Sequence, residues 1–559
     1  MIVDLTLYQK NNPPLINNMN NQKFFLIIAI FLSIFLLWDK WEITHTIDKN
    51  NNLISQTKIK NTSTINNSLT NQNLDIPSVT NRNNKLDLPN TDTKNQIPFT
   101  TVKTDLLTLE ISHKGGTIQN AWLNDYPIEI DSEQKFQLLS DRTGKIFQAQ
   151  SGLLPQGKMP THHSIFSSKN IYYQMDGNNL VVPFTWKSEN GIIVNKRYHF
   201  NKNSYVVGID YQITNTTNNT LHITSYTQLI RNIPDQDNMI MPTYTGGARF
   251  NDQDVYEKIE FEDFDDQPKT SYKGGWMAMI EHYFFVAVIP NLNQIHTYSS
   301  KIINDKYLLT VVNPELSIAP GATKTIINSN LYIGPKEQSH IDNVAPGLDK
   351  TVDYGILFII AKPLSELLNW IYSIIHSWGY SIIILTLLIK LAFYKLSEKS
   401  YRSMAGMRQL APRLKKLKET YGDNKQKLGK KTMELYKKEK INPASGCLPI
   451  LVQIPVFISL YWVLLEMVEL RQAPFWYLTD LSAPDPYYIL PLIMGISMFI
   501  QQKLNPPPPD PIQAKIMMAL PFVFTIFFLW FPSGLVLYWM INNILSITQQ
   551  WVINKRINN

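Results

Sequence analysis

The sequence predicts a polytopic α-helical membrane protein that carries a large all-β domain outside the membrane. The 559 residues are too many for one ordinary domain. They are 44% hydrophobic but only 17% charged, which is unusually poor in charge for a soluble protein. Long uncharged runs gather in the last third of the chain, as membrane spans do. Residues 99–345 instead show short β-rich segments separated by turn residues.

The first element, residues 1–41, is predicted to be an N-terminal segment with a transmembrane anchor. Lys23 precedes FFLIIAIFLSIFLLW (Phe24 to Trp38), an uncharged run of 15 residues. No small-residue cleavage pattern follows, and Trp38 and Trp41 suit a membrane interface. We therefore expect an uncleaved anchor rather than a signal peptide.

Residues 42–98 are predicted to form a flexible Asn-rich tether. They contain 13 asparagines but no aromatic residue and no glycine. Such a composition cannot bury enough apolar surface to offset the conformational entropy lost on folding.

Residues 99–345 are expected to form one all-β domain of packed antiparallel sheets. Five segments carry the strand pattern: LVVPFTW from Leu180, GIIVNKRYHF from Gly191, SYVVGIDYQI from Ser204, YFFVAVIP from Tyr283 and YLLTVV from Tyr307. No amphipathic helical run separates them, which favours a sandwich over an α/β fold.

No catalytic or metal-binding constellation is evident in this domain. The pairs Gly115-Gly116, Gly246-Gly247 and Gly274-Gly275 are expected to be turns, because none opens a helix after a strand. Three histidines, His113, His199 and His282, lack metal-ligand spacing and are expected to be hydrogen-bonded structural residues. We therefore expect no cofactor, no metal and no enzymatic activity. The single cysteine, Cys447, excludes an intrachain disulfide.

Residues 346–559 are predicted to contain five further membrane spans, six with the anchor. An amphipathic piece from Ile356 to Glu366 is expected to lie along the membrane surface. The spans follow in five runs: 367–389, 441–465, 486–502, 516–531 and 534–554.

The charge of the loop 395–440 predicts which side of the membrane each part of the chain faces. The loop holds 15 Lys and Arg against 5 Asp and Glu, a net charge of +10, which the positive-inside rule places in the cytoplasm. Both chain ends then lie inside and the β domain outside. Leucines and tyrosines recur at helical spacing, so the loop is expected to be a helical hairpin. Its basic residues could dock anionic lipid, ribosomal RNA or an acidic incoming chain, or could simply be a solvated face that fixes topology. They are Arg402, Arg408, Arg413, Lys415, Lys416, Lys430 and Lys431.

Polar residues within the spans gather towards the cytoplasmic side. Lys390 and Thr386 share a helix face, Gln453 lies in the next span, and Asn542, Ser546, Gln549 and Gln550 form a stripe in the last. Lys390 alone could snorkel to the headgroups, but the uncharged amides are too short to reach water and need partners. We expect a polar cavity in the inner leaflet, open to the cytoplasm; a sealed polar seam that joins helices is the alternative.

Such a cavity suits the reception of a hydrophilic segment of another chain better than the conduction of ions. A small-molecule transporter would need polar residues through the outer leaflet and an internal repeat. A membrane-tethered periplasmic carbohydrate-binding or carbohydrate-active protein would place the function in the β domain.

Several long strings closely resemble the YidC family of bacterial membrane protein insertases. In the membrane part they are NPASGCLPILVQIPVF from Asn442, VELRQAPF from Val468, DLSAPDPYYILPLIMG from Asp480 and FFLWFPSGLVLYW from Phe527. In the β domain they are VKTDLLTLEISHKGGTIQNAWL from Val102 and GGWMAMIEHYF from Gly274. Only the N-terminal tether lacks the resemblance.

The resemblance implies a five-helix insertase core with a hydrophilic groove and a periplasmic β-supersandwich in the bacterial inner membrane. It implies insertion of nascent membrane proteins, alone or with the Sec translocon. The ribosome and the signal recognition particle pathway are further candidate partners, and no DNA is expected. The predicted groove residues are Lys390, Thr386, Gln453, Trp539, Asn542 and Ser546.

Two positions depart from the family pattern. Lys390 falls where the family usually has an arginine, which keeps the charge but loses the planar fork for bidentate carboxylate pairing. Tyr394-Lys395-Leu396 lacks the proline that is common after the tyrosine.

Overall fold

The computed structural model covers the β domain and the helical part of the chain. The predicted anchor in residues 1–41 and most of the predicted tether in residues 42–98 lie outside the described residues. The structure describes residues 75–77, 97–130, 132–154, 159–233, 243–251, 253, 255–355, 357–422, 424–439, 448–505 and 511–558.

Two sheets form the β domain within the described residues, and every strand pairing is antiparallel except that of β1 with β7. The first sheet contains, in spatial order, β14 (Thr270–Lys273), β17 (Ile295–Ile303), β18 (Lys306–Val312), β11 (Leu221–Arg231), β5 (Lys145–Leu154), β4 (Lys135–Arg142), β3 (Thr117–Pro127), β2 (Leu107–Ser112), β1 (Phe99–Lys103) and β7 (Tyr172–Gln174), with β19 (Leu316–Ile318) paired to β11.

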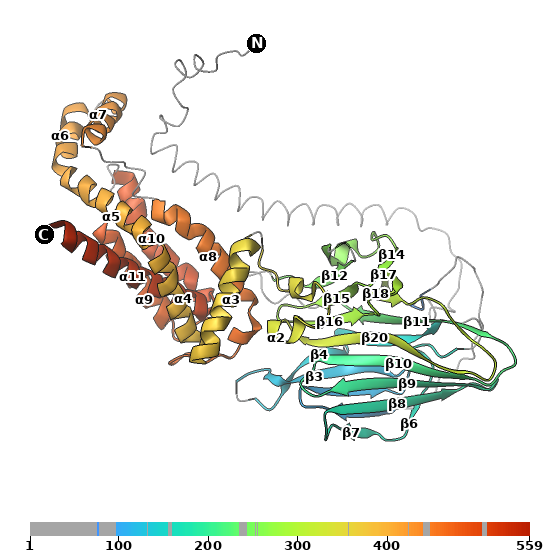
Figure 1. Ribbon diagram of the computed structural model, residues 1–559. Coiled ribbons are helices and arrows are strands. Elements are labelled where there is room, and N and C mark those ends of the chain that lie inside the picture. Colours follow the sequence, from blue (N-terminus) through green and yellow to red (C-terminus); the bar gives the residue numbers. More distant parts are fainter. Residues whose placement is uncertain are drawn as a thin grey trace, which may run out of the picture. The chain divides into compact units, whose positions relative to one another are not determined.

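The second sheet is the layer in which β20, β10, β9 and β8 lie side by side in Figure 1. Its order is β13 (Tyr256–Ile259), β12 (Gly246–Phe250), β15 (Trp276–Ile280), β16 (Phe284–Ile289), β20 (Thr323–Pro335), β10 (Val206–Asn215), β9 (Ile192–Asn201), β8 (Asn179–Lys187) and β6 (Ser167–Ser168). The Tyr211 hydroxyl donates to Ser151 Oγ in the first sheet at 3.1 Å, so the sheets pack face to face.

Strand β9 shows why these residues form a sandwich. Its side chains alternate between buried and partly exposed from Ile192 to Phe200, as the period of two in a strand requires. All five segments predicted as strands are strands, and the prediction of an all-β domain is confirmed. The prediction for Gly246-Gly247 is wrong, because these glycines begin β12 instead of forming a turn.

Lys196 is a buried polar residue of this domain whose partners are fixed. Lys196, which points into the core of the sandwich, is 0% exposed, and its ammonium donates to the Gly115 and Gly116 carbonyls at 2.8 and 2.9 Å. Burial holds the pKa of Lys196 well below its usual value. The three predicted structural histidines are also hydrogen-bonded: His113 to Thr100, His199 to Asp210 and His282 to the Leu465 carbonyl.

The C-terminal part is helical. Its α-helices are α2 (Gln338–Ile341), α3 (Phe358–Ile375), α4 (Trp378–Ala392), α5 (Tyr394–Gln409), α6 (Ala411–Tyr421), α7 (Lys425–Lys438), α8 (Leu448–Glu466), α9 (Ile489–Leu504), α10 (Pro511–Phe527) and α11 (Ser533–Asn558). By length and apolarity, α3 alone among the described helices could cross a membrane unaided; α4 with α5 also qualifies when the bent pair is taken as one span. Leu451–Glu466, Ile489–Leu504 and Ala514–Trp530 are shorter apolar helices.

The boundary between surface helix and span differs from the prediction. We expected the amphipathic piece to end at Glu366 and a span to begin at Leu367, but α3 continues to Ile375. His376 then adopts a left-handed conformation with φ 53°, and its N–H bonds to the Tyr372 carbonyl. Trp378 stacks on Tyr372 at 3.9 Å, which fixes the turn into α4.

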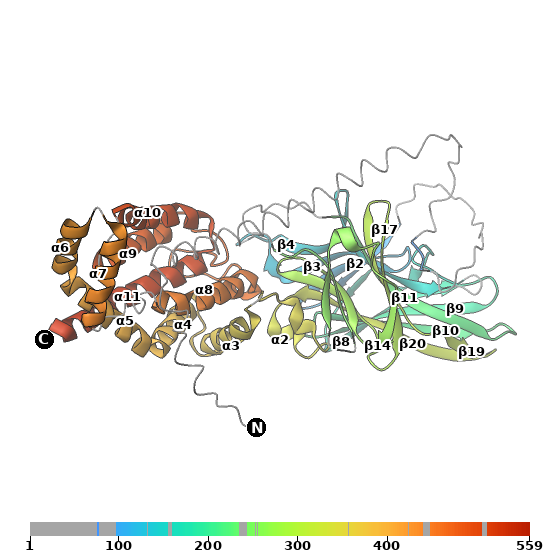
Figure 2. The same ribbon diagram turned by 90° about the horizontal axis from the view of Figure 1, so that it is seen from above.

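A bend leads into the basic loop, and the loop contains a helical hairpin. Helices α4 and α5 meet at 65°, with Phe393 between them, so the bend forms without a proline. Helices α6 and α7 lie side by side in Figure 2. Asn424 caps α7 by accepting from the Lys427 N–H at 2.9 Å.

A buried ion pair links the end of the β domain to the end of α8. Lys336 donates to Glu466 at 3.1 Å, and the two side chains are 1% and 2% exposed. Arg471, in the loop that follows α8, donates to the Pro127 carbonyl at 2.7 Å.

Candidate functional site

A cavity of about 420 Å³ lies among α4, α5, α8, α9, α10 and α11. Five of the six predicted groove residues line it: Lys390, Gln453, Trp539, Asn542 and Ser546. Four helices, α4, α8, α9 and α11, supply most of its polar groups, and α10 adds an apolar wall.

Lys390 is the charged residue of the cavity wall. It is half-buried near the end of α4, and its ammonium donates to the Ser546 hydroxyl of α11 at 2.8 Å. That hydroxyl in turn donates to the Asn542 carbonyl one turn earlier, at 2.7 Å. Among the described residues, the ammonium therefore bonds to a neutral hydroxyl instead of a carboxylate, which leaves its charge available to an anionic group.

Side-chain amides occupy the facing walls. Gln453 of α8 donates to the Tyr538 hydroxyl at 2.7 Å, and Asn543 donates to Ser497 of α9 at 3.1 Å. These bonds tie α8 and α9 to α11 across the cavity region. Polar side chains in an apolar span must find such partners, because unpaired groups there are costly.

Two polar atoms of the cavity wall have no hydrogen-bond partner among the described residues. They are Nε1 of Trp539 and Oδ1 of Asn542. An unpaired buried donor or acceptor costs about 1 to 3 kcal/mol. A donor and an acceptor left open beside a lysine favour the entry of water or of a polar segment.

The rest of the lining is apolar and adaptable. Phe457 packs edge to face against Trp539 with ring centroids 4.4 Å apart. Met498 and Met517 contribute flexible side chains from α9 and α10. The cavity thus combines a polar patch with walls that can follow different shapes.

Thr386, the sixth predicted groove residue, does not line the cavity, whereas three residues that the sequence did not predict do. Thr386 is 1% exposed, and its hydroxyl bonds to the Ile382 carbonyl of its own helix. Sequence reasoning missed Tyr401, Tyr538 and Asn543 as lining residues. Asn543 could have been predicted, because Asn542 and Asn543 are adjacent side-chain amides in an apolar run. Nothing in the sequence distinguishes Tyr401 and Tyr538 from the aromatic residues that lie at membrane interfaces.

The predicted basic residues divide into paired and unpaired groups. Arg402 bonds to Glu398 and Arg413 to Glu439, both at 2.7 Å, and Lys431 bonds to Glu434. Arg408 donates to the Lys503 carbonyl at 3.2 Å. No ion pair within the described residues involves the remaining three, Lys415, Lys416 and Lys430, which are exposed.

Comparison with known proteins assigns the family. Residues 370–559 match the family described as 60Kd inner membrane protein, and residues 100–367 match the YidC periplasmic domain. The protein called membrane protein insertase YidC in Ruthia magnifica subsp. Calyptogena magnifica is 86% identical over 540 residues, which are 97% of this chain and 100% of the relative. The chain belongs to the YidC family of membrane protein insertases. The relative of the same name in Methylobacillus flagellatus is 48% identical and covers 81% of this chain and 83% of its own length.

The family assignment fixes the broad function and location. This YidC-family protein is a membrane protein insertase with a periplasmic β domain. A solved structure titled "Active YidC insertase crystal structure with the first transmembrane domain resolved" is 16% identical, covers 81% of this chain and 94% of its own, and has a TM-score of 0.38. The assignment rests on the sequence relatives, whose identity is far higher.

Proposed function

We propose that this insertase is not an enzyme and works by holding a short hydrophilic segment of a nascent membrane protein in the cavity beside Lys390, while the adjacent apolar segment enters the lipid. The observation that carries the proposal is the open polar patch: a lysine bonded to a neutral hydroxyl, next to the unpaired Trp539 and Asn542 atoms. Hydrophilic groups moved into this patch keep hydrogen-bond partners, so the cost of leaving water falls.

The proposed topology has six membrane spans with both chain ends in the cytoplasm. The N-terminal anchor would be the first, and α4, α8, α9, α10 and α11 the others, with α3 along the periplasmic surface. The 15 residues of α4 span about 22 Å, so the bilayer would thin locally around the cavity. The net charge of +10 in residues 395–440 supports this orientation.

Charge would drive part of the transfer. Lys390 would attract an acidic segment into the cavity, and the membrane potential then contributes about 2.3 kcal/mol per charge per 100 mV as that segment passes to the positive outer face. The hydrophobicity of the client helix would supply the rest, so no nucleotide is required.

The basic hairpin would receive the client before it reaches the cavity. Its exposed lysines Lys415, Lys416 and Lys430 suit anionic lipid headgroups, the ribosome or a chain delivered by the signal recognition particle pathway. The Sec translocon is the proposed partner for larger clients.

The experiment is the insertion of a small single-span protein with an acidic tail into liposomes that contain the purified chain. The variants are Lys390→Ala, Lys390→Arg and, as a matched control, Lys555→Ala, because Lys555 lies over Trp551 outside the cavity lining. We expect the alanine at position 390 to lower insertion about tenfold, the size of one charged hydrogen bond. The arginine and the control should insert at the native rate.

Equal insertion by all four proteins would contradict the role of the charge. A native chain that inserts nothing alone would be retested with the Sec translocon in the same liposomes, and equal insertion there by the Lys390→Ala variant would again reject the role.

A further inference from the structure

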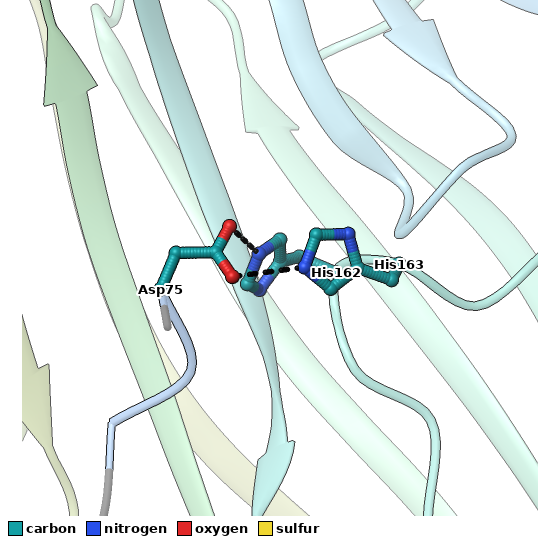
Figure 3. Close-up of side chains that lie close together, drawn as sticks. All are labelled: Asp75, His162 and His163. Atoms are coloured by element: carbon teal, nitrogen blue, oxygen red, sulfur yellow. Dashed lines mark hydrogen bonds and ion pairs between the residues drawn. The ribbon is translucent and has the colours of Figure 1, made fainter. Parts of the chain in front are cut away.

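Three potential metal ligands meet on the β domain. Asp75 comes from a short described stretch, residues 75–77, and His162 and His163 lie between β5 and β6. Figure 3 shows the Asp75 carboxylate facing both imidazole rings. Its Oδ2 lies 2.9 Å from His162 Nε2 and its Oδ1 lies 3.0 Å from His163 Nε2.

The spacing of these atoms suits a single transition-metal ion. The three ligand atoms lie within 4.8 Å of one another. Zinc binds imidazole nitrogen at about 2.0 to 2.1 Å and carboxylate oxygen at about 2.0 to 2.2 Å, which places tetrahedral ligands roughly 3.3 Å apart. Small side-chain adjustments would therefore bring all three atoms to bonding distance.

A second hydrogen bond already orients His162. Its Nδ1 lies 2.6 Å from the Tyr226 hydroxyl, so its Nε2 points to Asp75. Metal-binding histidines commonly have such a partner on the other ring nitrogen, which fixes the tautomer and the ring orientation. The His162 side chain is 1% exposed, which keeps the ring in this orientation.

The backbone that carries the two histidines is held in place independently of Asp75. The Gly115 N–H donates to the Ser164 carbonyl at 2.7 Å, and the Leu153 N–H donates to Pro160 at 3.0 Å. Gly115 has φ 70°, and a Cβ on it would lie 2.3 Å from the His162 carbonyl oxygen. Only glycine permits this close approach, so two of the three ligands are pre-organised.

Apolar packing positions the third ligand. Ile76 packs against the buried cluster of Leu154, Tyr226 and Val312. The Asp75 side chain is 22% exposed and that of His163 is 34% exposed, so an ion can enter from solvent. The stretch is thus fastened by one apolar contact and one polar cluster.

We propose that Asp75, His162 and His163 bind one divalent transition-metal ion of the zinc type, which fastens residue 75 to the β domain. Two imidazole nitrogens and one carboxylate oxygen are a ligand set that suits zinc and its neighbours, whereas calcium and magnesium prefer oxygen ligands alone. A water molecule would complete the tetrahedron. The ion would join segments 87 residues apart in the sequence.

The positions of the imidazole protons would differ between the metal-bound cluster and a cluster held by hydrogen bonds alone. Without an ion, both imidazoles carry a proton on Nε2, and Tyr226 donates to Nδ1 of His162. With an ion, the Nε2 atoms are deprotonated, and Nδ1–H of His162 donates to the Tyr226 oxygen. The Tyr226→Phe variant should consequently weaken metal binding, although this hydroxyl never touches the ion.

The test is equilibrium dialysis of the full-length chain, in detergent and without a histidine tag, against Zn²⁺ at pH 7.5. We expect one tightly bound ion per chain, a loss of affinity of at least tenfold in Asp75→Asn and in His163→Gln, and a loss of about 10-fold to 100-fold in Tyr226→Phe. Zinc-edge X-ray absorption should show two imidazole ligands in the native protein and one in His163→Gln.

His199→Gln is the matched control, because His199 also bonds to a carboxylate of the β domain, Asp210, at 2.7 Å. It should bind zinc like the native chain. The proposal is overturned if the native chain binds no stoichiometric zinc, or if Asp75→Asn and His163→Gln, with native melting temperatures, bind it unchanged.

Discussion

Two buried lysines of the β domain differ in their partners from the lysine of the helical cavity. In the β domain, Lys196 donates to two fixed carbonyls, and Lys336 is paired with Glu466. In the cavity, Lys390 has a neutral hydroxyl partner, and the Trp539 and Asn542 side chains each leave an atom unpaired among the described residues. The first arrangement stabilises one structure, whereas the second leaves hydrogen-bonding capacity for something that enters.

This difference predicts opposite consequences of substitution. Replacing Lys196 or Lys336 should reduce stability, because each has fixed partners. A replacement in the cavity should spare stability and reduce insertion, because the native contacts there are incomplete.

The largest effect is expected for Lys336→Met, which leaves Glu466 buried without its partner. Removing one partner of a buried ion pair costs about 3 to 5 kcal/mol, so the melting temperature in detergent should fall strongly. The double variant Lys336→Met with Glu466→Leu should recover most of the loss. If Lys336→Met alone melts at the native temperature, the buried polar contacts of the β domain do not stabilise it more than those of the cavity do.

Lys196→Met should destabilise by about 2 kcal/mol, because the Gly115 carbonyl loses its ammonium donor and Gly116 loses one of two donors. Thermal melting followed by β-sheet circular dichroism would measure this. Lys187→Met, at an exposed position of β8, is the control and should change little. Equal melting temperatures for Lys196→Met and Lys187→Met would mean that the buried Lys196 side chain contributes nothing to the stability of the sandwich.

His282 should make the β domain sensitive to acid. Burial and the nearby Lys336 charge lower the pKa of His282 from 6.5 to about 4. As the pH falls from 6.5 to 4, the unfolded chain takes up a proton that the folded chain does not, so stability is lost in that window.

We expect a contribution of about 1 to 2 kcal/mol to this loss at pH 5. His282→Gln, which keeps a donor for the Leu465 carbonyl, should lose less stability between pH 7.5 and 5. Parallel melting curves for the two proteins across this range would argue against a buried neutral imidazole.

The smallest effects should distinguish two adjacent asparagines of α11. Asn543→Leu loses the hydrogen bond to Ser497 and should destabilise by about 1 kcal/mol. Asn542→Leu removes the unpaired Oδ1 and should leave the melting temperature unchanged or slightly raised, while insertion falls about threefold. The reverse order of stabilities would show that Asn542 is a structural contact.

Local patterns allowed much of this structure to be predicted. The alternation of apolar and polar side chains in β9 predicted a sandwich, because a strand with one buried face shows a period of two whichever element covers that face. Uncharged polar residues in apolar runs, such as Gln453 and Asn542, pointed to the cavity, since each needs a partner in the membrane.

Long-range partners and backbone breaks could not be predicted. The Lys390–Ser546 bond joins residues 156 positions apart, and the three ligands on the β domain depend on a docking that no local pattern encodes. His162-His163 was overlooked because the third ligand lies in an asparagine-rich stretch. The turn at His376 was missed because its left-handed backbone depends on the Tyr372–Trp378 stack, which only the folded chain has.

The bond between Lys390 and Ser546 also bears on the timing of biosynthesis. Translation adds roughly 5 to 20 residues per second, so the 156 residues between the two take about 8 to 30 s. During that interval α4 has been made but α11, which supplies one wall, has not. A growing insertase chain therefore carries an unpartnered lysine and an unfinished cavity through most of the synthesis of its own helical part.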